Sequence, residues 1–305
     1  MRLDEDMSEH ETPVPSGSIV VGVDGSEGAA AALGWAVAHA QLVHRPLVLV
    51  HGWQDVASVW LDQAGVDALS LRDEISAAGE RVVADAASRV AADAPDLEVV
   101  RVVRSQDARA LLAELSEDAA VTVVGSRGRG PISALFLGSV SSAVARHGRG
   151  PVVVVRPGGP AVGQGRGVLA AIDGESGSDP VVEQAFAYAA ARALPLTVLH
   201  CTFDARMAVG GEATAEAREE AEEEARSVIA QATSGLSERY PDVAVTPMAV
   251  FGHVEEELVE AATDADLVVV GHRDRNPLVS ALLGSVSRTF LERAHGAVMV
   301  VPERD

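Results

Sequence analysis

The feature that most constrains this chain is a motif that occurs twice. In each copy an apolar run ends in a glycine, and a Gly-Ser pair follows 13 residues later. The leading glycines are Gly125 and Gly271, the later ones are Gly138 and Gly284, and the differences 271 − 125 and 284 − 138 are both 146. A fixed offset of this length means that the chain contains two copies of one domain.

The repeat extends over most of each half. Asp24 and Asp173 follow equivalent apolar runs, and His51 and His200 end a second pair of runs; 173 − 24 and 200 − 51 are both 149. The change of offset from 149 to 146 places a three-residue deletion in the second copy, between its second apolar run and its glycine motif. Because loops and surface helices absorb such changes, both halves are expected to keep one fold.

Within the first half, β-branched apolar runs alternate with alanine-rich stretches of helical length. The alternation predicts parallel βαβ units, and runs that are apolar throughout indicate a sheet covered by helices on both faces. We therefore predict an α/β chain with two doubly wound five-stranded parallel sheets of order 3-2-1-4-5, a flavodoxin- or Rossmann-like fold. The expected strands lie near 18–23, 47–52, 97–103, 121–125 and 151–155, and the expected helices near 27–44, 67–94, 107–118 and 138–147.

The two predicted domains span 18–156 and 167–302. Residues 157–166 are the predicted linker, because the stretch 156–167 contains five Gly and two Pro and has no hydrophobic periodicity. Residues 1–17 are acidic and lack the basic and apolar regions of a secretory signal, so we expect a disordered tail.

The last apolar run of each half, 152–155 and 298–301, lies at the edge of its sheet in the predicted order. An exposed apolar edge favours pairing with another strand. We therefore predict that the halves pack through these strands as a pseudo-twofold pair, an intrachain pseudo-dimer, and that chains associate further into a homodimer.

Charge and composition restrict the class of partner. With 45 acidic and 24 basic residues the formal net charge is −21, which repels nucleic-acid backbones and anionic lipid surfaces. No apolar run approaches the roughly 18 residues of a membrane span. The single cysteine, Cys201, excludes an intrachain disulfide and suits a reducing compartment. We expect a cytoplasmic protein with a small-molecule partner, and neither a nucleic-acid nor a membrane role.

The candidate site follows from the predicted fold. In an open parallel sheet, ligands bind beyond the carboxyl ends of the strands where the winding reverses, here between the first and fourth strands. Asp24 follows the first strand and Gly125 ends the fourth. Glycine at a strand end lets backbone N–H groups approach an anion, and a Gly-Ser pair at 138–139 adds the free N–H groups and positive dipole of a helix start. A carboxylate beside such a phosphate cradle suits a ribose and its phosphates.

At these residues the chain resembles the tandem universal stress proteins. The family's ATP-binding members carry G-x2-G-x9-G-[ST] after the fourth strand, an Asp after the first strand, and a contact from the residue after the His that ends the second. The first half matches throughout, with Gly125, Gly128 and Gly138 in the motif, Asp24 after the first strand, and Gly52 after the second. The resemblance implies an adenine nucleotide as partner and ATP, with or without Mg²⁺, as cofactor.

The resemblance also implies a role for each part of the first-half site. Asp24 and Gly52 would position the adenosine, Gly22 would let the base approach the first strand, and the remaining residues would hold the phosphates. The complete predicted set is Gly22, Asp24, Gly52, Gly125, Ser126, Arg127, Gly128, Arg129, Gly130, Gly138, Ser139, Val140 and Ser141.

The second half departs from the motif at Asp274, which stands where the first half has Gly128. Two charges ~4 Å apart repel by about 4 kcal/mol at an effective dielectric near 20, so this carboxylate should weaken phosphate binding. Asp tolerates left-handed backbone, and neighbouring His272, Arg273 and Arg275 offset its charge, so we expect a weakened rather than an abolished site. The candidate residues that remain are Asp173, Gly271, Arg273, Gly284 and Ser285.

Each feature taken alone has a simpler interpretation. Glycine after a strand is usually a turn, Gly-Ser before a helix is usually a cap, and Asp24 and Asp173 could cap the first helix of each half. His51 and His200 are expected to be structural residues at strand ends, and Arg127 and Arg129 could serve only solubility, although a place inside the cradle favours phosphate contact. The joint spacing is what predicts a nucleotide site.

Several functions are compatible with this site. We expect a nucleotide-binding regulatory module for stress response or growth control, with no catalytic and no metal-ligating residues. An enzyme is disfavoured because G-x4-G-K-[ST], S-G-G-x-D-S and G-x-S-x-G are all absent; slow ATP hydrolysis and a purely structural dimerisation module stay open. A Rossmann dehydrogenase is rejected, because the first turn reads GVDGSEG instead of G-x-G-x-x-G.

Overall fold

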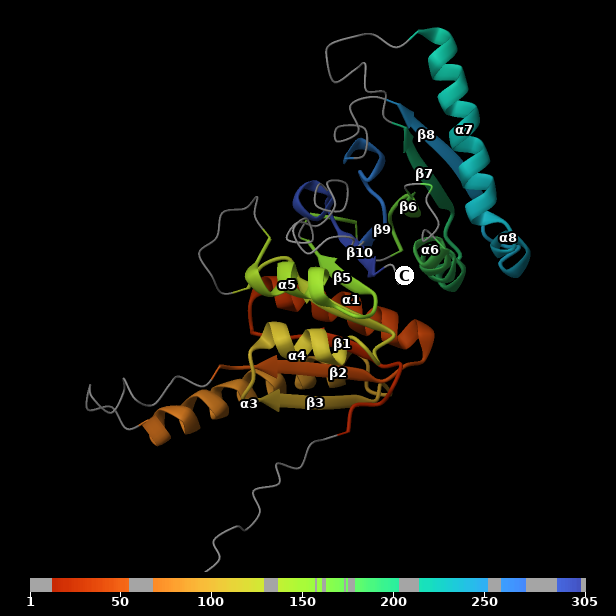
Figure 1. Cartoon of the computed structure of the whole chain (residues 1–305). Coiled ribbons are helices and arrows are strands. Elements are labelled where there is room, and N and C mark those ends of the chain that lie inside the picture. Colours follow the sequence, from red (N-terminus) through yellow and green to blue (C-terminus); the bar gives the residue numbers. More distant parts are fainter. Residues whose placement is uncertain are drawn as a thin grey trace, which may run out of the picture.

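The computed structural model describes residues 13–54, 68–128, 137–156, 158–160, 163–172, 174, 179–202, 214–251, 259–272 and 290–302. Within these residues the strands form one ten-stranded sheet of order β3-β2-β1-β4-β5-β10-β9-β6-β7-β8, which runs through both halves (Figure 1). Each half has the predicted order 3-2-1-4-5, and the second half is arranged as the mirror of the first.

The first half is parallel throughout and is covered on both faces. Its strands are β1 Ile19–Gly22, β2 Leu47–Gly52, β3 Val99–Arg104, β4 Val121–Gly125 and β5 Val152–Val155. Its helices are α1 Glu27–Val43, α3 Ala68–Asp93, α4 Ala108–Leu115 and α5 Ser139–His147. Helices α1 and α3 bury side chains in one core cluster, and α4 and α5 bury theirs in the other, on the opposite face of the sheet. Alternate residues of the strands enter the two clusters, which explains why the strands are mostly apolar; β3, at the edge of the sheet, carries the exposed Arg101.

The second half repeats this plan. Its strands are β6 Val168–Ile172, β7 Leu196–Thr202, β8 Val245–Phe251, β9 Leu267–His272 and β10 Ala297–Pro302, and the helices whose bounds the structure describes are α6 Asp179–Arg192, α7 Ala215–Thr233 and α8 Leu236–Arg239. Residue 47 pairs with 99, and residue 196 pairs with 245. The offset is therefore 149 before the α3 and α7 region and 146 after it, which locates the deletion between the second and third strands of the repeat.

The halves join through their closing strands, which pair antiparallel. Val153 pairs with Met299, Val152 with Val300 and Val154 with Val298. Since 299 − 153 is 146, the central pair consists of two equivalent residues, and a pseudo-twofold axis passes between them. Residues 152–155 and 297–301 of these strands are all buried, with Val153 and Val298 each 0% exposed. The predicted pseudo-twofold packing through these strands is confirmed.

Helices α1 and α6 add a second contact between the halves. The rings of Trp35 and Tyr188 are stacked, with centroids 6.0 Å apart and planes 6° from parallel. His39 lies 5.6 Å from Tyr188, and the Arg192 guanidinium lies 4.8 Å above the Tyr188 ring. His39 and Tyr188 are equivalent positions (188 − 39 = 149), so the pseudo-twofold axis also runs between these helices.

The described parts of the predicted tail and linker are packed against the domains. The backbone N–H of Gly17 donates to the carbonyl of Asp118 at 2.6 Å, so the end of the predicted tail is held on the first half. In the linker region, the Asp266 carboxylate accepts from the N–H groups of Gly165 at 2.9 Å and Gly167 at 3.0 Å. Among the helices that the structure describes, none has the length and apolarity needed to cross a membrane.

Candidate functional site

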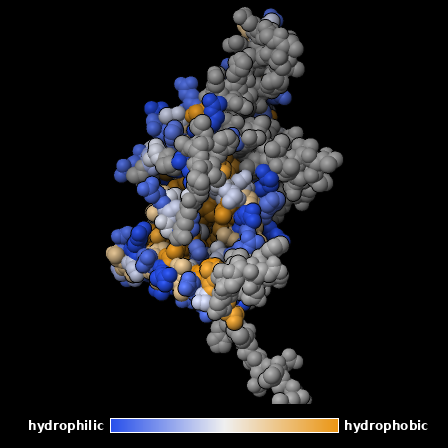
Figure 2. Space-filling model, turned by 90° about the vertical axis from the view of Figure 1, so that its left-hand side faces the viewer, coloured by the Kyte–Doolittle hydropathy of each residue, from blue (hydrophilic) through white to orange (hydrophobic). Residues whose placement is uncertain are grey.

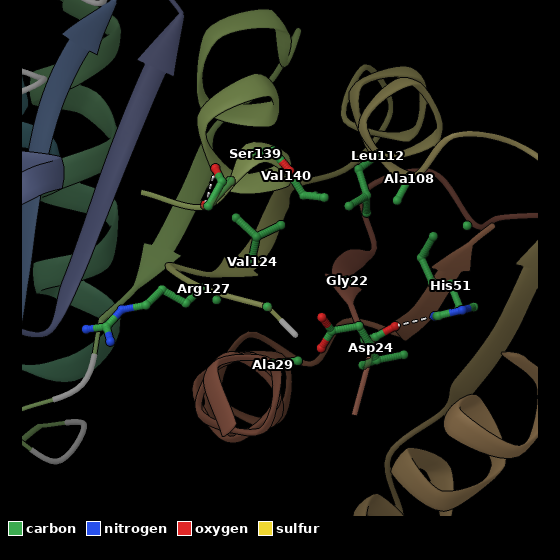
Figure 3. A pocket seen from close by; sticks show the side chains of 17 residues that line it. Gly22, Asp24, Ala29, His51, Ala108, Leu112, Val124, Arg127, Ser139 and Val140 are labelled. Atoms are coloured by element: carbon green, nitrogen blue, oxygen red, sulfur yellow. Dashed lines mark hydrogen bonds between the residues drawn. The ribbon is translucent and has the colours of Figure 1, made fainter. Parts of the chain in front are cut away.

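A pocket of about 220 Å³ opens at the carboxyl ends of β1 and β4, where the winding of the first half reverses. On this face of the molecule, apolar surface lies in a hollow bordered by hydrophilic residues (Figure 2). Ten of the predicted residues line the pocket: Gly22, Asp24, Gly52, Gly125, Arg127, Gly128, Gly138, Ser139, Val140 and Ser141. Residues 100 positions apart in sequence are thus brought together (Figure 3).

Ser126 lies beneath the pocket instead of lining it, and is only 1% exposed. Its carbonyl accepts from the backbone N–H of Gly138 at 2.8 Å and from the hydroxyl of Ser141 at 3.2 Å. Its own N–H donates to the carbonyl of Val155 at 2.8 Å. Ser126 therefore fixes the start of α5 against the end of β4. Arg129 and Gly130 of the predicted set lie outside the described residues.

The N-terminus of α5 forms one wall of the pocket. Gly138 is the N-cap and provides no side-chain hydrogen bond, while the Ser141 hydroxyl donates to the carbonyls of Ser126 and Gly138. Within the described residues, the N-cap therefore leaves the first-turn N–H groups, at the positive end of the helix dipole, without a side-chain cap. Ser139 and Val140 border the pocket at this end (Figure 3). Such an arrangement can bind an anion.

Asp24 borders the opposite side of the pocket. One carboxylate oxygen, Oδ1, accepts from the backbone N–H of Ser26 at 2.9 Å. The cap of α1 is Ser26, whose hydroxyl accepts from the N–H of Ala29 at 3.2 Å; the interpretation of Asp24 as the helix cap is therefore wrong. The other oxygen, Oδ2, lies beside Gly128, where an added Cβ would be 2.6 Å away.

The site glycines permit close approach between segments of backbone. A Cβ on Gly125 would lie 2.4 Å from the carbonyl carbon and oxygen of Gly28, and one on Gly28 would lie 2.2 Å from the carbonyl oxygen of Arg127. On the other side of the pocket, a Cβ on Gly52 would lie 2.7 Å from the carbonyl oxygen of Gln106. None of these glycines has a positive φ. They are required by packing between the walls of the pocket.

Several lining residues were missed by the sequence analysis: Val23, Ala29, Val50, His51, Ala108, Leu112 and Val124. Most are apolar and look like ordinary core residues, so nothing in their pattern indicates a ligand. The one available signal is the position of α4, which begins just after the third strand, at the same edge of the sheet as Asp24.

His51 and its equivalent His200 make the same contact in the two halves. The Nδ1 atom of His51 is 2.7 Å from the carbonyl oxygen of Val23, and that of His200 is 3.1 Å from the carbonyl oxygen of Ile172. Both histidines hold the ends of neighbouring strands, in agreement with their interpretation as structural residues. His51 also lines the pocket.

Arg127 lines the pocket, but its guanidinium extends away from Asp24, toward the second half (Figure 3). A phosphate held by the loop would lie at the base of this side chain. Direct contact with the guanidinium requires either a phosphate at the edge of the pocket or a different rotamer.

The second-half candidates lie mostly outside the described residues: Asp173, Arg273, Gly284 and Ser285, together with Asp274. Gly271 is described, is the last residue but one of β9 and pairs with Val301. In the part of the chain that the structure covers, no group of three or more His, Cys, Asp or Glu side chains could hold a metal ion.

Comparison with known proteins agrees with the fold and the duplication. The model of the universal stress protein family matches residues 16–156 and 166–302. A universal stress protein of Mycolicibacterium smegmatis is 35% identical over 295 residues, 94% of this chain and 97% of that protein. Universal stress protein Rv2623 of Mycobacterium tuberculosis is 32% identical over 300 residues, covering 93% of this chain and 96% of the relative. The chain belongs to the universal stress protein family, in its tandem form.

Solved structures show the same two-domain fold. The crystal structure of a universal stress protein from Archaeoglobus fulgidus has a TM-score of 0.58 at 17% identity and covers 95% of this chain and 99% of that one. A putative universal stress protein from Pseudomonas aeruginosa has a TM-score of 0.57 at 18% identity, with 94% of each chain covered.

Proposed function

We propose that the first half binds an adenine nucleotide, ATP, and that the chain is a nucleotide-dependent regulatory module of the stress response or of growth control. The observation that carries the proposal is the convergence of three groups in one pocket: the uncapped N-terminus of α5, the Gly125–Gly128 loop and the Asp24 carboxylate. The tandem universal stress protein family membership supports the same function.

The pocket offers each part of the nucleotide a wall of suitable chemistry. Val50, Ala108 and Leu112 form an apolar end that suits a planar base. The Oδ2 atom of Asp24 can accept hydrogen bonds from ribose hydroxyls. The N–H groups at the start of α5 suit phosphate oxygens, and a Mg²⁺ ion bound to those phosphates would supply charge neutralisation.

Binding without efficient chemistry is part of this proposal. Among the described residues that line the pocket, only Asp24, His51 and Arg127 are ionisable. Asp24 and His51 each contact backbone through one atom, which favours a positioning role. We expect slow ATP hydrolysis at most, in the cytoplasm, by a protein that forms homodimers.

Mass spectrometry of small molecules released from freshly purified, denatured protein tests the proposal directly, with calorimetric titration of ATP into nucleotide-free protein as the quantitative arm. We expect an adenine nucleotide in the released fraction and saturable binding of ATP. A folded protein that releases no nucleotide and does not bind ATP would favour the purely structural dimerisation module.

A further inference from the structure

We propose that the second half senses occupancy of the nucleotide site in the first half, through Arg127 and Arg156 at the junction of the two domains. This inference rests on the proposed function, because it assigns a regulatory output to that same site.

The first argument is a short path of hydrogen bonds from the site to the second half. The N–H of Ser126, at the start of the phosphate loop, donates to the carbonyl of Val155 at 2.8 Å. The next residue, Arg156, crosses to the second half: its N–H donates to the carbonyl of Gly296 at 2.7 Å, and its guanidinium donates to the carbonyl of Leu291. Val155, the last residue of β5, and Arg156, which follows it, thus connect the loop with the segment 290–296.

The second argument is electrostatic. The Arg156 guanidinium is partly buried, and burial lowers its pKa; the positive charge of Arg127 lowers it further, while Glu292 raises it. Because Arg127 lines the pocket and extends toward the second half (Figure 3), its charge acts at both places. A bound phosphate that reaches the edge of the pocket, or toward which Arg127 changes its rotamer, would pair with the Arg127 guanidinium, and the repulsion between Arg127 and Arg156 would fall.

The arrangement belongs to the first half alone. The position equivalent to Arg156 is Pro302 (302 − 156 = 146), which has no charged side chain and pairs with His272 at the end of β9. The charged contact therefore runs in one direction, from the site in the first half to the segment 290–296 of the second.

Hydrogen exchange on the full-length chain tests this inference, with the peptide that covers 290–296 as the reporter. In wild-type protein, saturating ATP should slow exchange of this peptide by about fivefold, the lower end of typical coupling between sites. Arg156→Gln should speed its exchange without ligand and remove the response to ATP, while calorimetry on the same sample still detects binding. Arg166→Gln is the matched control, because Arg166 is exposed, lies near the same junction and pairs only weakly with Asp264, at 3.9 Å.

A second variant tests the electrostatic step without any ligand. Arg127→Gln removes the repelling charge, so exchange of the same peptide should slow in the nucleotide-free protein. The inference is overturned if this variant leaves the exchange unchanged, if bound ATP leaves the reporter unchanged, or if Arg156→Gln responds to ATP as the wild type does. Absence of any calorimetric signal for ATP would contradict the proposed function itself and remove this inference with it.

Discussion

The two halves keep the same fold but differ at the loop that follows the fourth strand. Both have a positive-φ glycine after the first strand, Gly25 at +80° and Gly174 at +78°. In the first half Gly125 and Gly28 lie at the close contact between this loop and the first helix, and the sequence has glycine, Gly271 and Gly177, at both equivalent positions of the second half. Gly128, in contrast, corresponds to Asp274.

This difference separates glycines that the fold requires from a glycine that the ligand requires. A Cβ on Gly125 would meet backbone, which cannot move aside, whereas a Cβ on Gly128 would meet, among the described residues, only the Asp24 carboxylate. The backbone of Gly128 does not require glycine, since its φ is not positive. A side chain at this position thus obstructs the site and not the fold, which explains how the second half can carry an aspartate there.

The largest effect should come from Gly128→Asp, which places the second half's residue in the first-half site. The new carboxylate would lie beside Asp24 and close to the phosphates, at a cost of about 4 kcal/mol, so affinity for ATP should fall by about a thousandfold. Calorimetric titration measures this, with circular dichroism as the check that the variant is folded. Unchanged affinity in folded protein would mean that this loop does not bind phosphate.

In contrast to Gly128→Asp, Gly125→Ala should act on the stability of the fold. Its added methyl group would press on the backbone of Gly28, so we expect the free energy of unfolding to fall by about 3 kcal/mol, at the upper end of overpacking effects. Urea denaturation measures the loss, and Gly34→Ala on α1 is the control, because a Cβ there meets none of the residues that the structure describes within 4 Å. Equal stability of the two variants would remove the distinction between the two kinds of glycine.

A pH-dependent effect is expected where the halves meet, at the unlike pair of His39 and Tyr188. Burial, and then the charge of Arg192, lowers the pKa of His39 from 6.5 to about 4. Between pH 4 and pH 6.5 the unfolded chain binds a proton at His39 that the folded chain does not. The contribution of His39 to the free energy of unfolding is therefore complete above pH 6.5 and is lost as the pH falls toward 4. Its size is about 3 kcal/mol.

Urea denaturation of the wild type and of His39→Gln at pH 7 and pH 4.5 isolates this contribution. The wild type should lose more stability than the variant between the two pH values. Equal losses would show that His39 titrates in the folded protein much as it does in the unfolded chain.

The smallest effect should be a gain in the affinity of the second half for ATP. Asp274→Gly removes a carboxylate and leaves Gly271, Gly284 and Ser285 in place, so ATP should bind there about tenfold more tightly, with several differences from the first half remaining. One such difference is Cys201, which stands where the first half has Gly52. Titration of the double variant Gly128→Asp, Asp274→Gly shows the second site alone. No gain would mean that another residue closes it.

The fold could be predicted from the sequence because its determinants are local and are repeated. Apolar runs of strand length alternate with helical stretches, and the winding order places Asp24 and Gly125 at one crevice. The apolar closing strands, 152–155 and 298–301, predicted that the halves pack through them, while the register of Val153 with Met299 came from the structure. These inferences need only periodicity and topology.

The parts that could not be predicted depend on neighbours in space. Ala108 and Leu112 line the pocket because α4 packs beside β2, and Ser126 supports α5 from a buried position that its sequence does not reveal. The stacking of Trp35 on Tyr188 depends on how two halves meet. Contacts of this kind have no signature within a single segment.

The measurement that tests the central claim most directly is the stoichiometry of ATP binding to the unmodified, nucleotide-free chain by calorimetric titration. We predict one tight site per chain, in the half that contains Gly128, and weak or no binding in the half that contains Asp274. Two sites of equal affinity would contradict this account, because they would show that the aspartate turns away from the loop or is neutralised by its arginine neighbours.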